Sequence, residues 1–188
     1  YGCKELTLAD NLHYVYKVGE GAFKDTPLNN NLRSGEFNIG SSCSNMTEAA
    51  GEIGDYAFQN TSPKRVSIGN YIKTIGEYAF DGCSSMGVLF IGDNVTSIGN
   101  YAFSRCTSLA QIYLGKSLRF GIDFSQVFDA QMNLDKISIP DENTNYSDEG
   151  NCLVDIADSL WIGTNSSAIP NRVTAIRDYA FSGGKGVP

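Results

Sequence analysis

Few side chains in this 188-residue chain are able to do chemistry. The only histidine is His13, in the segment LHYVYK, and it lies beside no nucleophile motif and no set of metal ligands. A Ser-His-Asp catalytic triad or a Cys-His catalytic dyad would have to use this one imidazole. The sequence also lacks a phosphate-binding glycine loop. We therefore expect no catalytic residues, no cofactor and no enzymatic activity.

The cysteines are a second reactive group. They number five and form no CxxC pair, a pattern that indicates neither a disulfide framework nor a zinc site. Cys83 and Cys106 occupy the same position in two similar segments, so their thiols could bridge or bind a metal ion. The alternative is that they are small buried side chains, as free cysteines commonly are. Cys3 also falls at a hydrophobic position, so we expect buried side chains and no metal site.

Acidic side chains gather in DENTNYSDEG, residues 141–150. A calcium loop would place oxygen ligands at alternating positions and end in a bidentate glutamate, and this segment does neither. We expect a solvated loop, with weak cation binding as the alternative.

The net charge of the whole chain is −7 and there is no basic cluster. This argues against nucleic-acid binding, because phosphate contacts need Lys and Arg. No apolar run is long enough for a membrane span.

A repeated six-residue motif indicates the structural elements that position the side chains described above. IGDYAF, IGEYAF and IGNYAF end at Phe58, Phe80 and Phe103, and degenerate copies are VGEGAF, IDFSQVF and IRDYAF. The period of about 23 residues lies in the range of leucine-rich repeats. One unit cannot bury its own apolar face, whereas stacked units bury it against each other. We count about seven units and expect the three phenylalanines to form a ladder.

Each unit also contains a short strand. Apolar residues that alternate with other residues, such as Leu89 and Ile91, indicate a strand with one buried face. The other pairs are Leu6 and Leu8, Phe37 and Ile39, Val66 and Ile68, Ile112 and Leu114, and Ile137 and Ile139. The GxYAF segment is too short for a full helix, so we expect a helical turn or 3₁₀ piece there. Gly76 and Gly99 are expected to bend the chain before it with positive φ.

The hydrophobic positions that recur in each repeat resemble the BspA-like (Treponema-type) leucine-rich repeat family. Its pattern is C-x-x-L-x-x-I-x-I-P-x-x-V-x-x-I-G-x-x-A-F. CTSLAQIYL and ISIP match its first half, and VTSIGNYAF and IPNRVTAIRDYAF match its second half. Residues 41–52, 119–130 and 143–167 depart from it. The expected fold is a right-handed leucine-rich-repeat solenoid of the α/β horseshoe type, with short parallel strands on its concave face and turns and 3₁₀ pieces on its convex face. We expect one array over residues 1–188, with irregular insertions near 41–52 and 141–167.

The resemblance implies a non-catalytic secreted or cell-surface protein, most often bacterial, that mediates adhesion or other protein binding. The first residues, YGCKEL, do not have the pattern of a signal peptide. We expect the chain to be a piece of a longer precursor, with its signal and anchor elsewhere. The alternative function is a structural spacer that presents another domain of a larger surface protein. Uncovered ends of such an array would also allow self-association.

Strand register predicts which side chains face outward on the concave sheet. One outward column holds Thr7, Asn38, Ser67, Phe90, Tyr113 and Ser138, and its neighbour holds Glu5, Glu36, Arg65, Val88, Gln111 and Lys136. Val88, Phe90 and Tyr113 stand out because apolar clusters on polar faces are typical of contact sites. The alternative is that Phe90 and Tyr113 stack across strands and stabilise the sheet. Together with Arg65 and Gln111 they form the candidate binding face for a protein or, as the alternative, a glycan.

Overall fold

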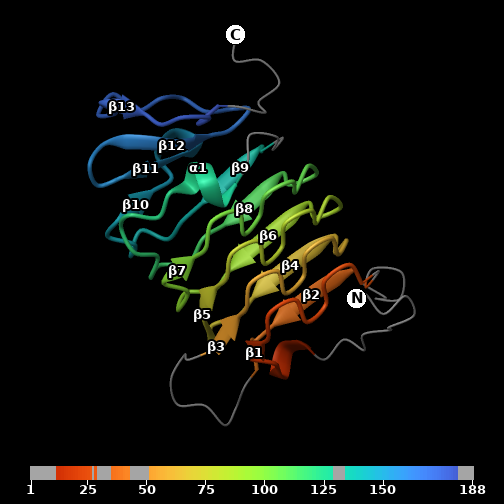
Figure 1. Ribbon diagram of the computed structural model, residues 1–188. Coiled ribbons are helices and arrows are strands. Elements are labelled where there is room, and N and C mark those ends of the chain that lie inside the picture. Colours follow the sequence, from red (N-terminus) through yellow and green to blue (C-terminus); the bar gives the residue numbers. More distant parts are fainter. Residues whose placement is uncertain (1–11, 27, 29–34, 43–50, 129–133, 182–188) are drawn as a thin grey trace.

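The molecule is a stack of similar rungs, each formed by one repeat (Figure 1). It is a computed structural model that describes residues 12–26, 28, 35–42, 51–128 and 134–181. Consecutive rungs contribute strands to two parallel sheets on different sides of the stack. The first has five strands, in the order β2 (Glu36–Ile39), β4 (Arg65–Ile68), β6 (Val88–Ile91), β8 (Gln111–Tyr113) and β9 (Lys136–Ser138). The second has four, in the order β1 (Lys17–Val18), β3 (Gly51–Ile53), β5 (Ile72–Ile75) and β7 (Ser97–Ile98).

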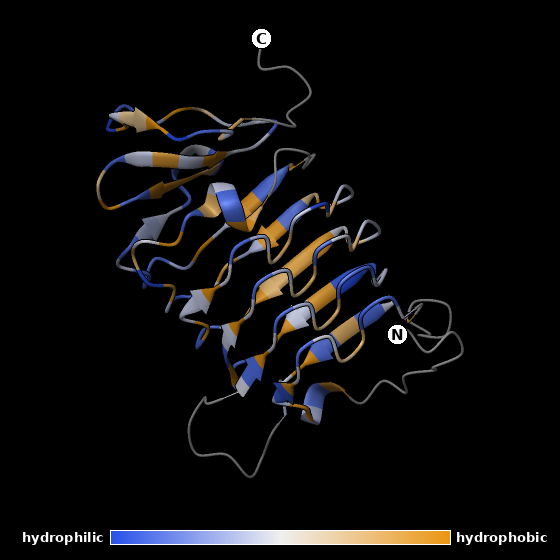
Figure 2. Ribbon diagram, in the orientation of Figure 1, coloured by the Kyte–Doolittle hydropathy of each residue, from blue (hydrophilic) through white to orange (hydrophobic). Residues whose placement is uncertain are grey.

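The five-stranded sheet confirms the predicted strands and the leucine-rich-repeat fold. Val66 and Ile68 are buried in β4, as are Leu89 and Ile91 in β6. Figure 2 shows hydrophobic and hydrophilic residues mixed along β2 and β4, whereas β6 is hydrophobic throughout. The predicted strand at Leu6 and Leu8 lies outside the described residues, as does most of the insertion near 41–52.

The four-stranded sheet is an addition to the predicted fold. In β5 the buried residues Ile72 and Ile75 are separated by two exposed residues. This spacing does not give the alternation that identifies a half-buried strand. Parallel pairing with the neighbouring rungs nevertheless holds the segment extended, with Ile75 level with Ile53 on one side and Ile98 on the other.

The predicted phenylalanine ladder is confirmed and is longer than expected. Phe80 is fully buried and stacks between Phe58 and Phe103, with ring centroids 5.0 and 5.3 Å away. Phe23 and Phe128 continue the ladder at its two ends, at 5.1 and 5.5 Å. Stacked aromatic pairs at such distances stabilise more than the burial of their area alone. The repeated phrase therefore places the same ring in the same layer of every rung.

Backbone hydrogen bonds join the phenylalanine layers. The Phe58 N–H donates to the Ala79 carbonyl at 2.7 Å, and the Phe80 N–H donates to the Ala102 carbonyl at 2.8 Å. Both alanines are fully buried. A small side chain at this position lets the next rung approach closely enough for these bonds to form.

The GxYAF segments are successive turns, as predicted, but they contain neither an α-helical nor a 3₁₀ turn in the described copies. The expected positive φ at Gly76 and Gly99 is wrong. The left-handed residues are instead Tyr78, with φ of 53°, and Tyr101, with φ of 59°. A left-handed residue in the middle of the segment interrupts any right-handed helical path. This conformation is unfavourable for a bulky side chain, and contacts between the tyrosines of neighbouring rungs offset it.

Gly76 and Gly99 are required for close packing between rungs. A Cβ atom on Gly99 would lie 2.6 Å from the Glu77 nitrogen and 2.7 Å from the Gly76 carbonyl carbon. One on Gly76 would lie 2.6 Å from the Asp55 nitrogen. Contacts this short with backbone atoms cannot be relieved by a rotamer change. A second glycine column, formed by Gly69, Gly92 and Gly115, packs in the same way at the corner after the five-stranded sheet.

Two departures from the repeat pattern have defined structures. Within residues 119–130, α1 (Phe124–Val127) begins after Asp123, whose carboxylate accepts a hydrogen bond of 3.0 Å from the Ser125 N–H. The segment after β9 forms the strands β10 (Tyr146–Ser147), β11 (Cys152–Asp155) and β12 (Ser159–Gly163), with the 3₁₀ turn η3 (Glu149–Asn151) before β11. In this segment β11 pairs antiparallel with both β10 and β12. The last rung begins with β13 (Ala175–Ile176), which pairs parallel with β12. The 3₁₀ turn η1 (Leu12–Tyr14) precedes β1.

A buried carboxylate links three rungs. Asp81 is only 3% exposed, and it accepts hydrogen bonds from the Gln59 side-chain amide at 2.7 Å and from the Arg105 Nε at 2.8 Å. Burial acts to raise the pKa of Asp81, but the hydrogen bonds from Arg105 and Gln59 outweigh it, and the pKa lies below its usual value. A lowered pKa adds stability above the unfolded value near 3.8, and this stability is lost as pH falls through the folded value.

We expect Asp81→Asn to lower the free energy of unfolding at pH 7 by about 1.5 to 3 kcal/mol, the range for hydrogen bonds to charged groups. The difference from the wild type should shrink as pH falls below 3.8. Urea unfolding at pH 7 and at about pH 3 measures both quantities. The matched control is Asp141→Asn, at an exposed carboxylate. A difference that stays constant with pH would contradict this role for the ionised group.

Candidate binding surface

The outward columns of the five-stranded sheet have the predicted register. Arg65 is level with Val88 and Val88 with Gln111, while Phe90 is level with Tyr113. Glu36 and Lys136 lie at the two ends of the first column, and Asn38 and Ser138 lie at the ends of the second. Thr7 and Glu5 lie outside the described residues. The sheet therefore brings the five candidate residues together on one surface.

The aromatic centre of this surface is a stacked pair. The rings of Phe90 and Tyr113 lie 4.6 Å apart between centroids, with planes inclined by 8°. The Arg65 guanidinium lies over the Phe90 ring at 6.0 Å, and the Lys136 ammonium lies over the Tyr113 ring at 5.1 Å. Val88, Phe90 and Tyr113 are each half-buried. We call the four stacked side chains Arg65, Phe90, Tyr113 and Lys136 the cation–aromatic stack.

Two polar contacts fix the edges of the cation–aromatic stack. The Tyr113 hydroxyl donates to the Gln111 side-chain oxygen at 3.2 Å. Arg65 forms an ion pair of 3.4 Å with Glu36 on the neighbouring strand. Both partners are at least partly exposed, so the ion pair contributes little to stability. Its main effect is to orient the guanidinium beside the Phe90 ring.

The predicted stacking of Phe90 on Tyr113 is present, so these rings do contribute to packing across the sheet. Their edges and the Val88 side chain remain open to solvent. The rings are thus held in fixed orientations without being covered by the chain. A partner could bind them at little cost in side-chain entropy.

A second aromatic column was missed by the sequence analysis. Tyr78 stacks between Tyr56 and Tyr101, with centroids 5.1 and 5.0 Å away. Burial raises the pKa of Tyr78, and the neighbouring Tyr101 and Tyr56 act in the same direction. The tyrosine in each GxYAF copy was the available signal. Because both faces of the Tyr78 ring are covered by its neighbours, this ring presents only its edge and its hydroxyl.

The cysteines are buried, as expected, where the structure describes them. The Cys83 thiol donates to the Phe58 carbonyl at 3.4 Å, and the Cys106 thiol makes the same contact with Phe80 one rung later. Burial raises the pKa of the Cys83 thiol to about 12, although its hydrogen bond with Thr61 acts in the opposite direction. These thiols are inert packing groups rather than nucleophiles. Cys3 and Cys43 lie outside the described residues.

The acidic segment 141–150 is only partly a solvated loop. Asp141 and Glu142 are exposed, but Asn143 and Tyr146 are buried. The Asn143 side-chain oxygen accepts hydrogen bonds from the backbone N–H groups of Asn145 and Tyr146, at 2.8 and 3.0 Å. The prediction of a solvated loop is therefore wrong for this inner part, where side-chain hydrogen bonds satisfy the backbone.

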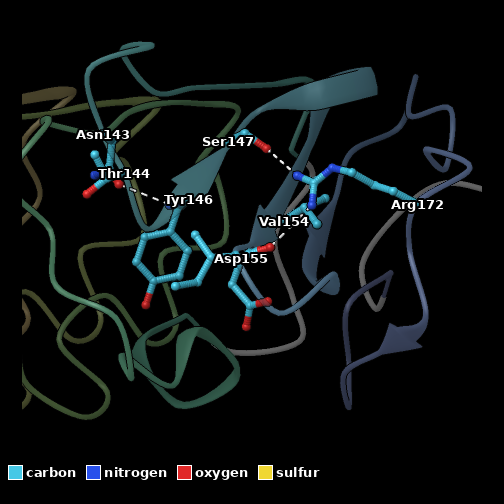
Figure 3. Close-up of a pocket in the computed structure, with 8 residues that line it drawn as sticks. Asn143, Thr144, Tyr146, Ser147, Val154, Asp155 and Arg172 are labelled. Carbon is cyan, nitrogen blue, oxygen red and sulfur yellow. Dashed lines mark hydrogen bonds between the residues drawn. The ribbon is translucent and has the colours of Figure 1, made fainter.

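A pocket of about 170 Å³ lies beside this segment, between Tyr146, Asp155 and Arg172 (Figure 3). Arg172 donates to the Ser147 hydroxyl at 2.7 Å and to Glu149 at 2.8 Å, and it also pairs with Asp158. Hydrogen bonds with its acidic partners raise the pKa of Arg172. Because the guanidinium is already bound on several sides, it ties the last rung to the antiparallel strands and is not available to a ligand.

Among the described residues, no group of three His, Cys, Asp or Glu side chains could hold a metal ion. The helices in that part of the chain include none long and apolar enough to cross a membrane. His13 lies in η1 and contacts the Tyr14 ring, with centroids 4.0 Å apart.

The last rung is less covered than the inner rungs. Ile176 is 54% exposed, whereas Ile98 at the same repeat position is 6% exposed. Tyr179 is 69% exposed and Tyr101 38%. The following rung supplies the missing cover at inner positions. Self-association through this end stays a prediction.

Comparison with known proteins identifies the class of repeat. Residues 51–152 match the description "BspA type Leucine rich repeat region", in six copies. The match covers more than half of the chain, and the chain therefore belongs to this family of leucine-rich repeat proteins. No curated protein matches it.

A solved structure agrees with this fold. The pneumococcal vaccine antigen PcpA superposes with a TM-score of 0.67 at 16% identity, over 88% of this chain. This chain spans 40% of the length of that structure. A leucine-rich repeat protein from Bacteroides capillosus is 24% identical and covers 60% of this chain, with 82% of its own length matched and a TM-score of 0.47. At these identities the likeness concerns the fold alone.

Proposed function

We propose that this chain is a non-catalytic binding module of a secreted or cell-surface protein, and that it binds a protein partner through the five-stranded sheet. The observation that carries the proposal is the half-buried group of Val88, Phe90 and Tyr113 on an otherwise polar face. Large aromatic side chains held in fixed orientations are favoured anchors at protein interfaces. The extracellular location is supported by the repeat family and by the likeness in fold to a protein that is a vaccine antigen.

The charged side chains on the five-stranded sheet indicate which chemical groups a partner would need in order to complement it. Arg65 and Lys136 lie at opposite ends of the cation–aromatic stack, although the chain as a whole carries a net charge of −7. A partner with an apolar or aromatic residue flanked by carboxylates would complement this arrangement. The stack fits a glycan less well, because Phe90 and Tyr113 cover each other's inner ring faces.

The test is a binding screen on arrays of extracellular-matrix proteins and glycans, with the double variant Phe90→Ser/Tyr113→Ser beside the wild type. We expect a protein hit whose affinity falls at least tenfold in the variant, because two anchors are removed together. The control is Tyr78→Ser/Tyr101→Ser, which alters the tyrosine column on the turns. Circular dichroism establishes that each variant is folded.

Unchanged affinity in a folded Phe90→Ser/Tyr113→Ser variant would contradict the site. Equal loss in the control variant would show a general effect on folding rather than on a surface. Dependence of the wild-type affinity on salt tests the charge argument, since exposed ion pairs weaken as ionic strength rises.

The second candidate function is a spacer that holds another domain away from a surface. The uninterrupted phenylalanine ladder from Phe23 to Phe128 favours it, because a continuous core makes a stiff array. A spacer has no ligand of its own. It would give no hit in the screen, and binding would then be the task of the domain that it presents.

A further inference from the structure

A second pocket lies where the irregular parts of the chain meet. Its volume is about 250 Å³. It is formed by the start of α1, the strand β12, and β13 with the two residues after it, which come from separate parts of the sequence. The residues that line it include Asp123, Ser125, Trp161, Ile176, Arg177 and Asp178.

Trp161 forms a rigid wall of this pocket. Its indole N–H donates to the buried Asp155 carboxylate at 2.8 Å, and its ring meets Phe124 edge-on at 6.3 Å between centroids. Because the only polar atom of the side chain points away into the molecule, hydrophobic ring atoms face the pocket. Trp161 is half-buried, so part of the ring remains accessible.

Arg177 extends this wall. It lies level with Trp161, because Leu160 pairs with Ile176 in the β12–β13 ladder. Its guanidinium lies over the indole at 4.7 Å from the ring centroid. A guanidinium stacked on an aromatic ring keeps its N–H donors at the rim. In the described part of the chain, those donors have no hydrogen-bond partner.

The remaining polar groups of the pocket are acceptors. Asp123 uses one carboxylate oxygen to cap α1, through the Ser125 N–H and hydroxyl, and its other oxygen has no partner among the described residues. The exposed Asp178 carboxylate likewise has no partner within the described ranges. Ile176 adds an exposed apolar surface. The pocket thus combines fixed donors, free acceptors and an apolar wall.

We propose that this pocket binds a single sugar unit of a neutral glycan. A sugar hydroxyl both donates and accepts, so it can satisfy the carboxylates and the guanidinium at once. An anionic ligand would face two carboxylates, and a cationic ligand would face the guanidinium. The volume lies below the roughly 300 to 1,000 Å³ of pockets for larger ligands. This site is separate from the five-stranded sheet and does not depend on the function proposed for it.

Trp161 is the only tryptophan among ten tyrosines in the chain, so tryptophan fluorescence, excited at wavelengths that tyrosine does not absorb, reports on this pocket. The experiment titrates the protein with D-glucose, D-mannose and N-acetyl-D-glucosamine, and with choline and acetate as charged comparators. We expect a saturable change with at least one sugar, at millimolar concentration as befits a small site, and weaker responses to choline and acetate. Asp178→Asn and Arg177→Gln should each weaken the sugar response at least tenfold.

The matched control is Asp141→Asn, the same change at an exposed carboxylate outside the pocket, which should titrate like the wild type. The Phe90→Ser/Tyr113→Ser variant should also keep its sugar response, which separates this site from the sheet. No response to any of the three sugars, a stronger response to choline or acetate, or unchanged titration of both pocket variants would overturn the proposal. A thermal unfolding scan confirms that the variants compared are folded.

Discussion

Replacing Phe80 by alanine is expected to lower the free energy of unfolding by about 3 to 5 kcal/mol, the range for a buried phenylalanine. The ring is fully buried and stacks on Phe58 and Phe103. Its loss would leave a cavity bordered by two rungs and remove both stacking contacts. Since backbone hydrogen bonds hold the rungs at a fixed separation, the neighbouring rings cannot close the gap. Urea unfolding of the variant and the wild type measures the effect.

The control is Phe90→Ala, which removes the same side chain from the half-buried sheet face. Its stacking with Tyr113 is lost but no closed cavity forms, so we expect a loss of about 1 kcal/mol. Equal losses in the two variants would contradict the view that the ladder, rather than the sheet surface, dominates stability.

Gly99→Ala is expected to destabilise the fold by roughly 3 kcal/mol or more, at the upper end of overpacking effects. The added methyl group would lie 2.6 and 2.7 Å from backbone atoms of Glu77 and Gly76. Neither atom can rotate away, so the two rungs must separate and weaken their shared hydrogen bonds. The φ angle of Gly99 is not positive, so the loss would arise from contact and not from backbone strain. Thermal and urea unfolding measure it.

Gly87→Ala is the matched control, because it also lies outside the positive-φ region. A Cβ atom there would meet the Lys64 and Ser108 carbonyl oxygens at 3.8 and 3.9 Å, which are ordinary contacts. Alanine at a compatible glycine stabilises by about 0.4 to 1 kcal/mol through the unfolded chain. A destabilisation at Gly87 as large as at Gly99 would contradict the explanation by close approach between rungs.

The regular part of the fold could be predicted because its signals are local and repeated. The alternation of Leu89 and Ile91 fixes which side chains of β6 point inward, and repetition fixes the register of its neighbours. This is why the outward columns, including Phe90 beside Tyr113, agree with expectation. The second sheet could not be predicted in this way, because the spacing of Ile72 and Ile75 does not follow the strand period.

Other features depend on contacts between units and leave no local pattern. The positive φ falls on Tyr78 rather than Gly76, and the glycine instead admits the backbone of the previous rung. The antiparallel pairing of β11 and β12 replaces a rung that the repeat pattern lacks. The Trp161 pocket joins α1, β12 and the segment after β13, and no spacing rule brings these together.

The parallel sheets have a mechanical consequence. Hydrogen bonds between neighbouring strands run along the stack, so successive rungs are connected in series. A tensile load applied along this axis is carried by each junction in turn, and the weakest junction yields first. The Ile98 and Phe103 positions are covered on both sides, whereas Ile176 is not. Under tension along the stack, the array would therefore lengthen one junction at a time, while the better covered junctions keep their length.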